Sequence, residues 1–510
     1  MKPIIIKYGW LLLLAVAGLW VWSSSSPSVP GEYSSAEKQP TIYPDYAGVT
    51  VPCNIAPLTF RIEDEASGYV TRFSAGDCEA VVSGNDVALS QKEWKALVAE
   101  AAGGGISVEV FLKEDGEWAK YKPFMVNVSP DSIDSYISYR LIPPSYVAYE
   151  NLSICQRSLS SYDEDVIYHN MLGGSEPNGQ CINCHAYKNY KTDNMQFHVR
   201  QHNGGTVFVH NGEAKKLNLK TDSTISAGVY PSFNPKYDVV AYSVNNTGQI
   251  FHTKHPNKVE VQDKASDVIV YNPVEGTVMH VADSKEHLEV FPCWSPDGKM
   301  LYYCSAHFEK KDTSLTVEAE MIIRYKEVKY DILRRPWNPE TGEFGAVDTV
   351  FMASELGKSA TFPRVSPNGK YLLFAMAEYG CFHIWHKDAD LYLIDLKTNQ
   401  LRNVREINSK DVESYHSWSS NGRWILFTSR RDDGGYTRLY IAYFDKSGRA
   451  HKPFILPQKD PYFYNDYYKS YNVPEYMIEP VTITPQEFAR HIEQPVQSAV
   501  FKGNTTSETK

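Results

Sequence analysis

The chain has 510 residues, more than one hydrophobic core usually organises, so a large domain and a smaller one are expected. Its net charge of −10 argues against a nucleic-acid binder, because such a protein needs a basic face to meet phosphates. The 35 tyrosines, 29 prolines and 31 glycines favour strands and turns over long helices.

Residues 1–22 have the pattern of an export segment. Lys2 and Lys7 precede an apolar run that ends with Trp20 and Trp22, as in a secretory signal. No A-x-A cleavage site follows, so an uncleaved membrane anchor is favoured over a cleaved signal peptide. We therefore expect the body at the periplasmic face of the cytoplasmic membrane, or free in the periplasm if the segment is cleaved. Residues 23–40 form a Ser/Pro linker.

Residues 41–170 are predicted to form a small, β-rich mixed domain. A helix is expected over 90–102, with Ser90 as N-cap and Glu93 completing a capping box. A hairpin is expected about Asp115 and Gly116. No catalytic motif is visible in this region.

Residues 171–205 contain a C-x-x-C-H motif formed by Cys181, Cys184 and His185. A structural zinc site needs four ligands, and no second C-x-x-C exists, although Cys155 or His169 could complete a set. A thioredoxin-like dithiol normally has a βαβ context, which is missing here. A plain disulfide between the two cysteines is a further alternative.

The motif resembles that of c-type cytochromes. The resemblance implies one covalent haem c, with Cys181 and Cys184 as thioether residues and His185 as the proximal iron ligand. Export agrees with it, because such haem is attached outside the cytoplasmic membrane.

The sixth iron ligand is open at this point. Met195 and His198 are the nearest strong candidates, and Met171, His202, a remote residue or an open position are the alternatives. A closing Met or His favours electron transfer, whereas an open iron permits small-ligand chemistry.

Residues 206–460 repeat themselves. The repeats are "YPSFNPKYDVVAYS", "FPCWSPDGKMLYYCS", "FPRVSPNGKYLLFAM" and "YHSWSSNGRWILFTS", each followed by an outer hairpin. Such periods fit four-stranded propeller blades. Four full blades and one half-blade, at 206–219, are visible. We expect five to seven blades, with six favoured, and strands near 188–200 and in the first region should supply those that are missing.

The blade sequences resemble the TolB-type, WD40-like (PD40) β-propeller repeats. "WSPDGKMLYY", "VSPNGKYLLF" and the segment from Ser429 to Tyr440 carry this resemblance. It implies a β-propeller fold but no particular activity, because propellers host many functions.

Residues 461–510 are expected to form a C-terminal extension with a short helix, capped by Thr484 and Glu487, and a disordered tail. His383 and His386 lie near Asp388 and Asp390, a spacing that resembles a metal cluster. In a propeller these are more often hydrogen-bonded structural residues.

The sequence thus predicts a mainly β protein, with a six-bladed TolB-like propeller behind a small mixed domain and an N-terminal anchor. The expected function is an envelope c-type haem protein with an electron-transfer or haem-linked redox role, served by a redox or envelope protein partner. One alternative is a propeller interaction platform with a structural haem or none. Another is a redox enzyme with an open haem iron. An electron carrier or haem scaffold is favoured over an enzyme.

Overall fold

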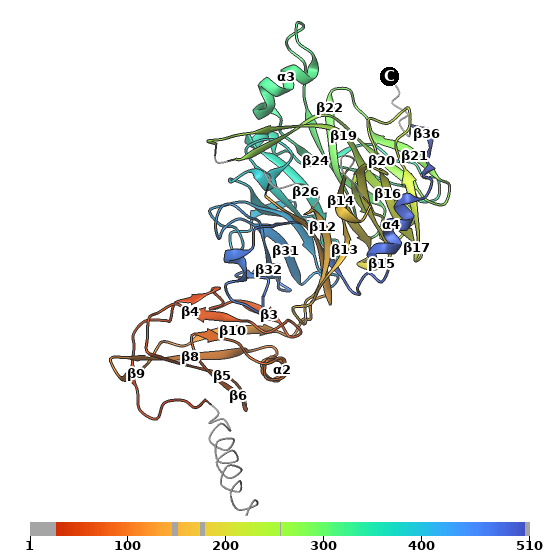
Figure 1. Cartoon of the computed structure of the whole chain (residues 1–510). Helices are drawn as coiled ribbons and strands as arrows, with labels where there is room; N and C mark the ends of the chain where they lie inside the picture. The colour runs from red at the N-terminus through yellow and green to blue at the C-terminus, as the bar shows by residue number, and fades with distance from the viewer. Residues whose placement is uncertain (1–26, 145–150, 174–178, 256, 505–510) are drawn as a thin grey trace, which may run out of the picture.

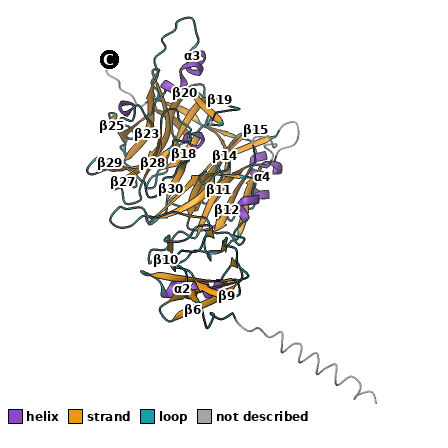
Figure 2. Cartoon of the chain, turned by 90° about the vertical axis from the view of Figure 1, so that its left-hand side faces the viewer, coloured by secondary structure: helices purple, strands orange, loops and turns teal. Residues whose placement is uncertain are grey.

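The computed structural model describes residues 27–144, 151–173, 179–255 and 257–504. The fold is mainly β, and a small N-terminal domain lies against one side of a larger propeller (Figure 1). The view in Figure 2 shows the same separation of the two bodies. Within the described ranges no helix is both long and apolar enough to cross a membrane. The expected anchor, residues 1–22, lies outside those ranges.

The small domain is built on a seven-stranded sheet and a three-stranded sheet. The larger sheet contains β1 (Ser34–Ser35), β3 (Thr50–Pro52), β5 (Gly68–Ala75), β6 (Cys78–Ser83), β8 (Gly105–Glu114), β9 (Glu117–Lys120) and β10 (Phe124–Ser129). The smaller contains β2 (Ile42–Tyr43), β4 (Phe60–Ile62) and β7 (Asp86–Val87). Helix α2 (Gln91–Glu100) packs on the larger sheet and has the predicted capping box between Ser90 and Glu93.

Six further sheets form the propeller, and each contains four antiparallel strands. The first three blades in chain order contain β14 (Gln180–Lys188), β15 (Lys191–Gln201), β16 (Gly205–His210) and β17 (Glu213–Asn218); β18 (Val229–Phe233), β19 (Val240–Phe251), β20 (Val259–Asn272) and β21 (Thr277–Ala282); and β22 (His287–Trp294), β23 (Met300–His307), β24 (Asp331–Pro336) and β25 (Asp348–Phe351). Blades 4 and 5 contain β26 (Ser359–Val365), β27 (Tyr371–Ala377), β28 (Asp390–Asp395) and β29 (Gln400–Asn403); and β30 (Glu413–Trp418), β31 (Trp424–Ser429), β32 (Arg438–Tyr443) and β33 (Phe454–Ile455).

The sixth blade closes the ring by joining two distant parts of the chain. Its inner strand is β34 (Ser470–Met477), and its outer strands are β11 (Tyr136–Ile142), β12 (Ser153–Ser158) and β13 (Glu164–His169). The inner strands of successive blades contact one another, and β34 contacts β14. Closure leaves the propeller without an open end between blades. The prediction of six blades is confirmed.

The sheets run across the domain boundaries expected at residues 170, 205 and 460. Residues 136–169 belong to blade 6, residues 180–201 to the inner half of blade 1, and residues 470–477 supply the last inner strand. The expected domain boundaries were placed where the sequence repeats begin and end. The strands that cross them show no such repeat, because they are held by pairing between segments that are distant along the chain.

Each inner strand contains one residue in the left-handed backbone region. These residues, with φ from 43° to 58°, are Cys184, Tyr230, Phe291, Phe362, Tyr415 and Val473. The strand register shifts at each of them, so each marks a β-bulge. Four of the six are aromatic, and they meet at the axis: the ring centroids of Phe291 and Phe362 are 4.1 Å apart, and those of Phe362 and Tyr415 4.6 Å.

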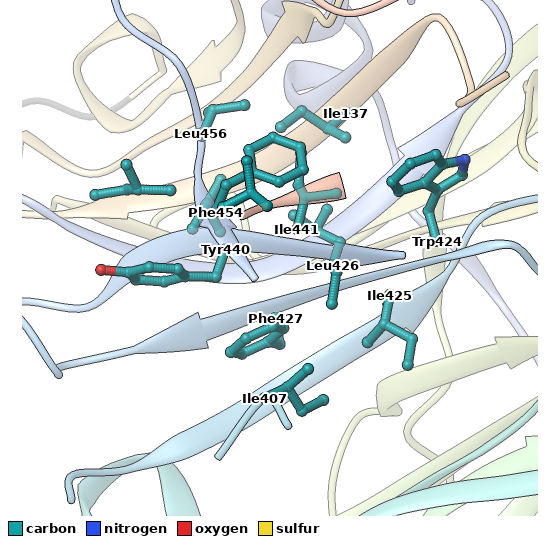
Figure 3. Close-up of a cluster of buried hydrophobic side chains, with 14 of the residues drawn as sticks. Ile137, Ile407, Trp424, Ile425, Leu426, Phe427, Tyr440, Ile441, Phe454 and Leu456 are labelled. Atoms are coloured by element: carbon teal, nitrogen blue, oxygen red, sulfur yellow. The ribbon is translucent and has the colours of Figure 1, made fainter. Parts of the chain in front are cut away.

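Apolar side chains fill each blade and its joints. In blade 5, Ile425, Leu426 and Ile441 are fully buried. Leu426 and Ile441 lie on the face that points toward Ile137 of blade 6, and Ile425 lies on the opposite face (Figure 3). The indole of Trp424 donates a hydrogen bond of 3.0 Å to the backbone oxygen of Ser132, in the segment that links the two domains. The linking segment is thereby attached to blade 5, and β3 of the small domain contacts β32 of the same blade.

The remaining elements lie outside the blades or cover them. Helix α4 (Pro485–Glu493) has the predicted capping box and packs against blades 1 and 6. After it, β35 (Gln497–Ser498) and β36 (Val500–Asn504) add parallel strands to blades 1 and 2. Helix α3 (Val317–Arg324) packs on β20. The short 3₁₀ helices are η2 (Asn170–Leu172), η3 (Tyr325–Glu327), η4 (Ser354–Leu356), η5 (His383–Trp385) and η6 (Phe463–Asp466).

Candidate functional site

The C-x-x-C-H motif lies on β14, the inner strand of blade 1. Cys184 is the left-handed residue of this strand, so Cys184 and His185 form the bulge that the other blades also have. The equivalent segments are "CHAY", "YPSF", "FPCW", "FPRV", "YHSW" and "VPEY". The repeats recognised in the sequence do not include β14. Five of the six segments have an aromatic residue three positions after the left-handed residue, and this shared feature could have identified β14 as a further repeat.

Cys184 and His185 line a cavity on the propeller axis. The other walls include Tyr230, Phe291 and Phe362, and the cavity has a volume of about 30 Å³. Such a volume holds about one water molecule. The ring of Phe382 lies against those of Tyr230, Phe291 and Phe362.

The imidazole of His185 is buried and lacks hydrogen bonds. The residue is 1% exposed, and neither ring nitrogen has a partner at normal hydrogen-bond geometry among the described residues. Burial, aided by the charge of Arg140, lowers its pKa to about 3, and the backbone groups of Val473 and Ser138 act in the opposite direction. His185 is therefore neutral at physiological pH, the form in which imidazole ligates a metal.

The two motif cysteines differ in their surroundings. Cys181 is half-buried, and Nη2 of Arg140 donates to its Sγ over 3.7 Å. Cys184 is buried, and burial raises the pKa of its thiol while the charges of Arg200 and Arg140 oppose the rise. All eight cysteines are free thiols in this structure, so the alternative of a disulfide within the motif is not realised.

The two leading candidates for the sixth ligand lie away from the His185 cavity. His198 is buried on β15, with Nδ1 3.2 Å from the hydroxyl of Thr206. Met195 is fully buried in the apolar cluster between blades 1 and 6. Neither residue lines the cavity that holds the His185 ring. Met171 is 55% exposed on η2, and His202 is also exposed.

The other histidines singled out from the sequence make structural contacts. His383 is hydrogen-bonded to Thr361 and to the backbone oxygen of Gly380. Nε2 of His386 lies 2.8 Å from a carboxylate oxygen of Glu260. In the part of the chain that the structure describes, no three His, Cys, Asp or Glu side chains are grouped as a metal site, so neither the His/Asp spacing nor the zinc alternative finds a ligand set there.

The donor set of the motif fits haem c in its chemistry. It offers two free thiols and a buried, neutral imidazole without hydrogen bonds, and cationic Arg140 lies beside Cys181. The axial cavity is too small to enclose a macrocycle, because ligand pockets usually measure about 300–1,000 Å³. The motif therefore supplies the attachment atoms, but the cavity does not supply the space.

No protein-family model matches the chain, and no curated protein matches it. Among solved structures it is similar to tricorn protease, with 12% identity, a TM-score of 0.33, and coverage of 69% of this chain and 34% of that one. It is also similar to oligogalacturonate lyase from Vibrio parahaemolyticus, with 14% identity, a TM-score of 0.32, and coverage of 81% and 100%. An ACO/RPE65 chimera shares 11% identity at a TM-score of 0.36, covering 86% and 97%. This chain thus spans about a third of tricorn protease, and at these TM-scores the similarities carry no argument about function.

Proposed function

We propose that this chain is an exported, membrane-tethered c-type haem protein of the TolB-like propeller type, with one covalent haem and an electron-transfer role. The observation that carries the proposal is the His185 imidazole, which is buried, neutral and without a hydrogen bond of normal geometry among the described residues. It directly follows the free cysteine Cys184, and Cys181 lies on the same strand. An unpaired buried polar group is costly, and native proteins rarely keep one without a purpose.

The chain would hold the group through its own residues, but the cavity beside His185, of about 30 Å³, would have to widen to admit a macrocycle. Cys181 and Cys184 supply the thioether sulfurs, and His185 supplies the proximal nitrogen. Such a group supplies one-electron chemistry at iron. Burial keeps the proton off His185, so its lone pair is available, and Arg140 places a positive charge beside Cys181. The propeller would then present the site to a redox partner in the cell envelope.

Two other functions are supported by specific observations. Tyr415 and His416 form the bulge of blade 5 without any cysteine, which favours a propeller that serves as an interaction platform without haem. The positions of Met195 and His198 outside the His185 cavity favour an open iron, and hence a redox enzyme.

The test is expression in a host competent for cytochrome c maturation, followed by a pyridine haemochrome spectrum. We expect about one haem per wild-type chain, clear loss in Cys184→Ala, and full occupancy in the control Cys78→Ser, which changes a half-buried cysteine of the small domain. Absence of haem from the wild type would overturn the proposal and favour the platform. If haem is present, carbon monoxide binding to the ferrous protein identifies an open iron.

A further inference from the structure

A second cavity, of about 330 Å³, opens at one mouth of the propeller axis. The residue two positions after each left-handed residue lines it, so every blade contributes one side chain at the same level. These six residues are Ala186, Ser232, Cys293, Arg364, Ser417 and Glu475. The volume lies in the range of small-molecule sites.

Two polar side-chain atoms in this ring lack hydrogen-bond partners. Nε of Arg364 and Oγ of Ser417 are buried without a hydrogen bond in the described structure, and Ser417 is only 3% exposed. Among the described residues, Arg364 forms one ion pair, from its Nη2 to a carboxylate oxygen of Glu475 at 3.2 Å, and it also interacts with the thiol of Cys293. A guanidinium has five N–H donors, so these contacts leave donors for a ligand.

Aromatic side chains form part of the wall of this cavity. Phe233, Trp294 and Trp418 come from three different blades and line it beside the polar ring. The Trp418 indole donates to the backbone oxygen of Arg364 over 3.1 Å, which fixes the backbone that carries the guanidinium. Aromatic rings beside charged and polar groups can bind a small organic ligand that has both an apolar and a polar part.

We propose that this axial cavity binds a small organic carboxylate with an apolar body. The ligand carboxylate would accept hydrogen bonds from Arg364 and Ser417, and its body would lie against the aromatic wall. Arginine suits this role because its planar fork matches a carboxylate. Glu475 then competes with the ligand carboxylate for Arg364. Burial raises the pKa of the Glu475 carboxyl, which makes Glu475 a weaker competitor.

The proposal does not depend on haem at His185. Arg364 and Glu475 line both cavities, so the pair lies between the ligand site and the His185 cavity. The two sites can therefore be tested separately.

The experiment is isothermal titration calorimetry of the purified full chain, with 3-phenylpropionate and with its neutral analogue 3-phenylpropionamide as ligands. We expect the carboxylate to bind at least tenfold more tightly than the amide. Arg364→Gln should remove this preference, and Glu475→Gln should strengthen carboxylate binding because it removes the competitor. Arg334→Gln, which breaks an exposed ion pair with Asp348, is the matched control and should bind like the wild type.

A folding defect would weaken binding in both variants. Weaker binding by Arg364→Gln together with tighter binding by Glu475→Gln therefore cannot come from misfolding. Equal binding of carboxylate and amide, absence of binding to the wild type, or weaker carboxylate binding by folded Glu475→Gln would each overturn the proposal.

Discussion

Blades 1 and 5 place a histidine at the same point of the propeller in two different environments. His416 follows Tyr415 in blade 5, and its Nε2 lies 3.1 Å from the backbone oxygen of Leu373 in the preceding blade. His185 follows Cys184 in blade 1, and both of its ring nitrogens, rather than Nδ1 alone as in His416, lack hydrogen-bond partners among the described residues. A histidine here can thus be wholly structural. What sets blade 1 apart is the cysteine in place of an aromatic ring and the unpaired imidazole beside it.

The largest expected effect is on stability, from removing one of the aromatic side chains that other blades have where blade 1 has Cys184. Phe362→Ala removes a ring that packs against Phe291 and Tyr415 at the axis. Large-to-small changes of buried aromatic residues cost about 3–5 kcal/mol in the free energy of unfolding. Urea unfolding followed by tryptophan fluorescence measures it. Phe251→Ala, at a side chain that is 62% exposed, is the control, and equal effects of the two changes would contradict an axial core.

A smaller effect is expected from protonation of His416. Burial lowers its pKa to about 3, with the charge of Arg364 adding to the shift, whereas an unfolded histidine titrates near 6.5. Between these values the unfolded state binds the extra proton, so the contribution of His416 to stability is complete above about pH 6.5 and is lost as the pH falls.

The stability advantage of the wild type over His416→Leu should therefore shrink by about 1–2 kcal/mol from pH 7 to pH 5. Both proteins contain the same buried acids, so the contributions of these acids to the pH dependence cancel in the difference. Glu289 is one of them: its pKa is raised to about 9, so its contribution to stability falls as the pH rises. A pH-independent difference would show that His416 titrates normally in the folded protein.

The smallest effect compares the two histidines directly at pH 7.5 in haem-free protein. His416→Leu loses a hydrogen bond and should cost about 1 kcal/mol. His185→Leu replaces a ring with no hydrogen bonds and should be neutral or stabilising. Thermal denaturation of both variants gives the comparison. A larger loss for His185→Leu would mean that this imidazole has a structural partner after all.

The sequence predicted most of the fold because its signals are local. The turn residues and apolar strands of blades 2–5 repeat, and the Ser90 and Thr484 capping boxes lie where expected. The makeup of blade 6 was not predictable, since β34 and β11 pair across more than 300 residues, and only the short segment "VPEY" of β34 resembles the repeats. The sequence singled out the motif residues but not their place on the axis, because Cys184 stands where four of the other five bulges have an aromatic residue. Arg364 and Glu475, which line the proposed ligand site, were not singled out from the sequence because only the ring of blades brings them together.

The most direct test of the account is a mass spectrum of the proteolytic peptide that contains Cys181 and Cys184. The protein should come from a host that attaches haem to a control cytochrome c. The account predicts that this peptide carries the added mass of one haem and that neither cysteine reacts with an alkylating agent. An unmodified peptide with two alkylated cysteines would contradict it, and blade 1 would then be a sixth structural blade.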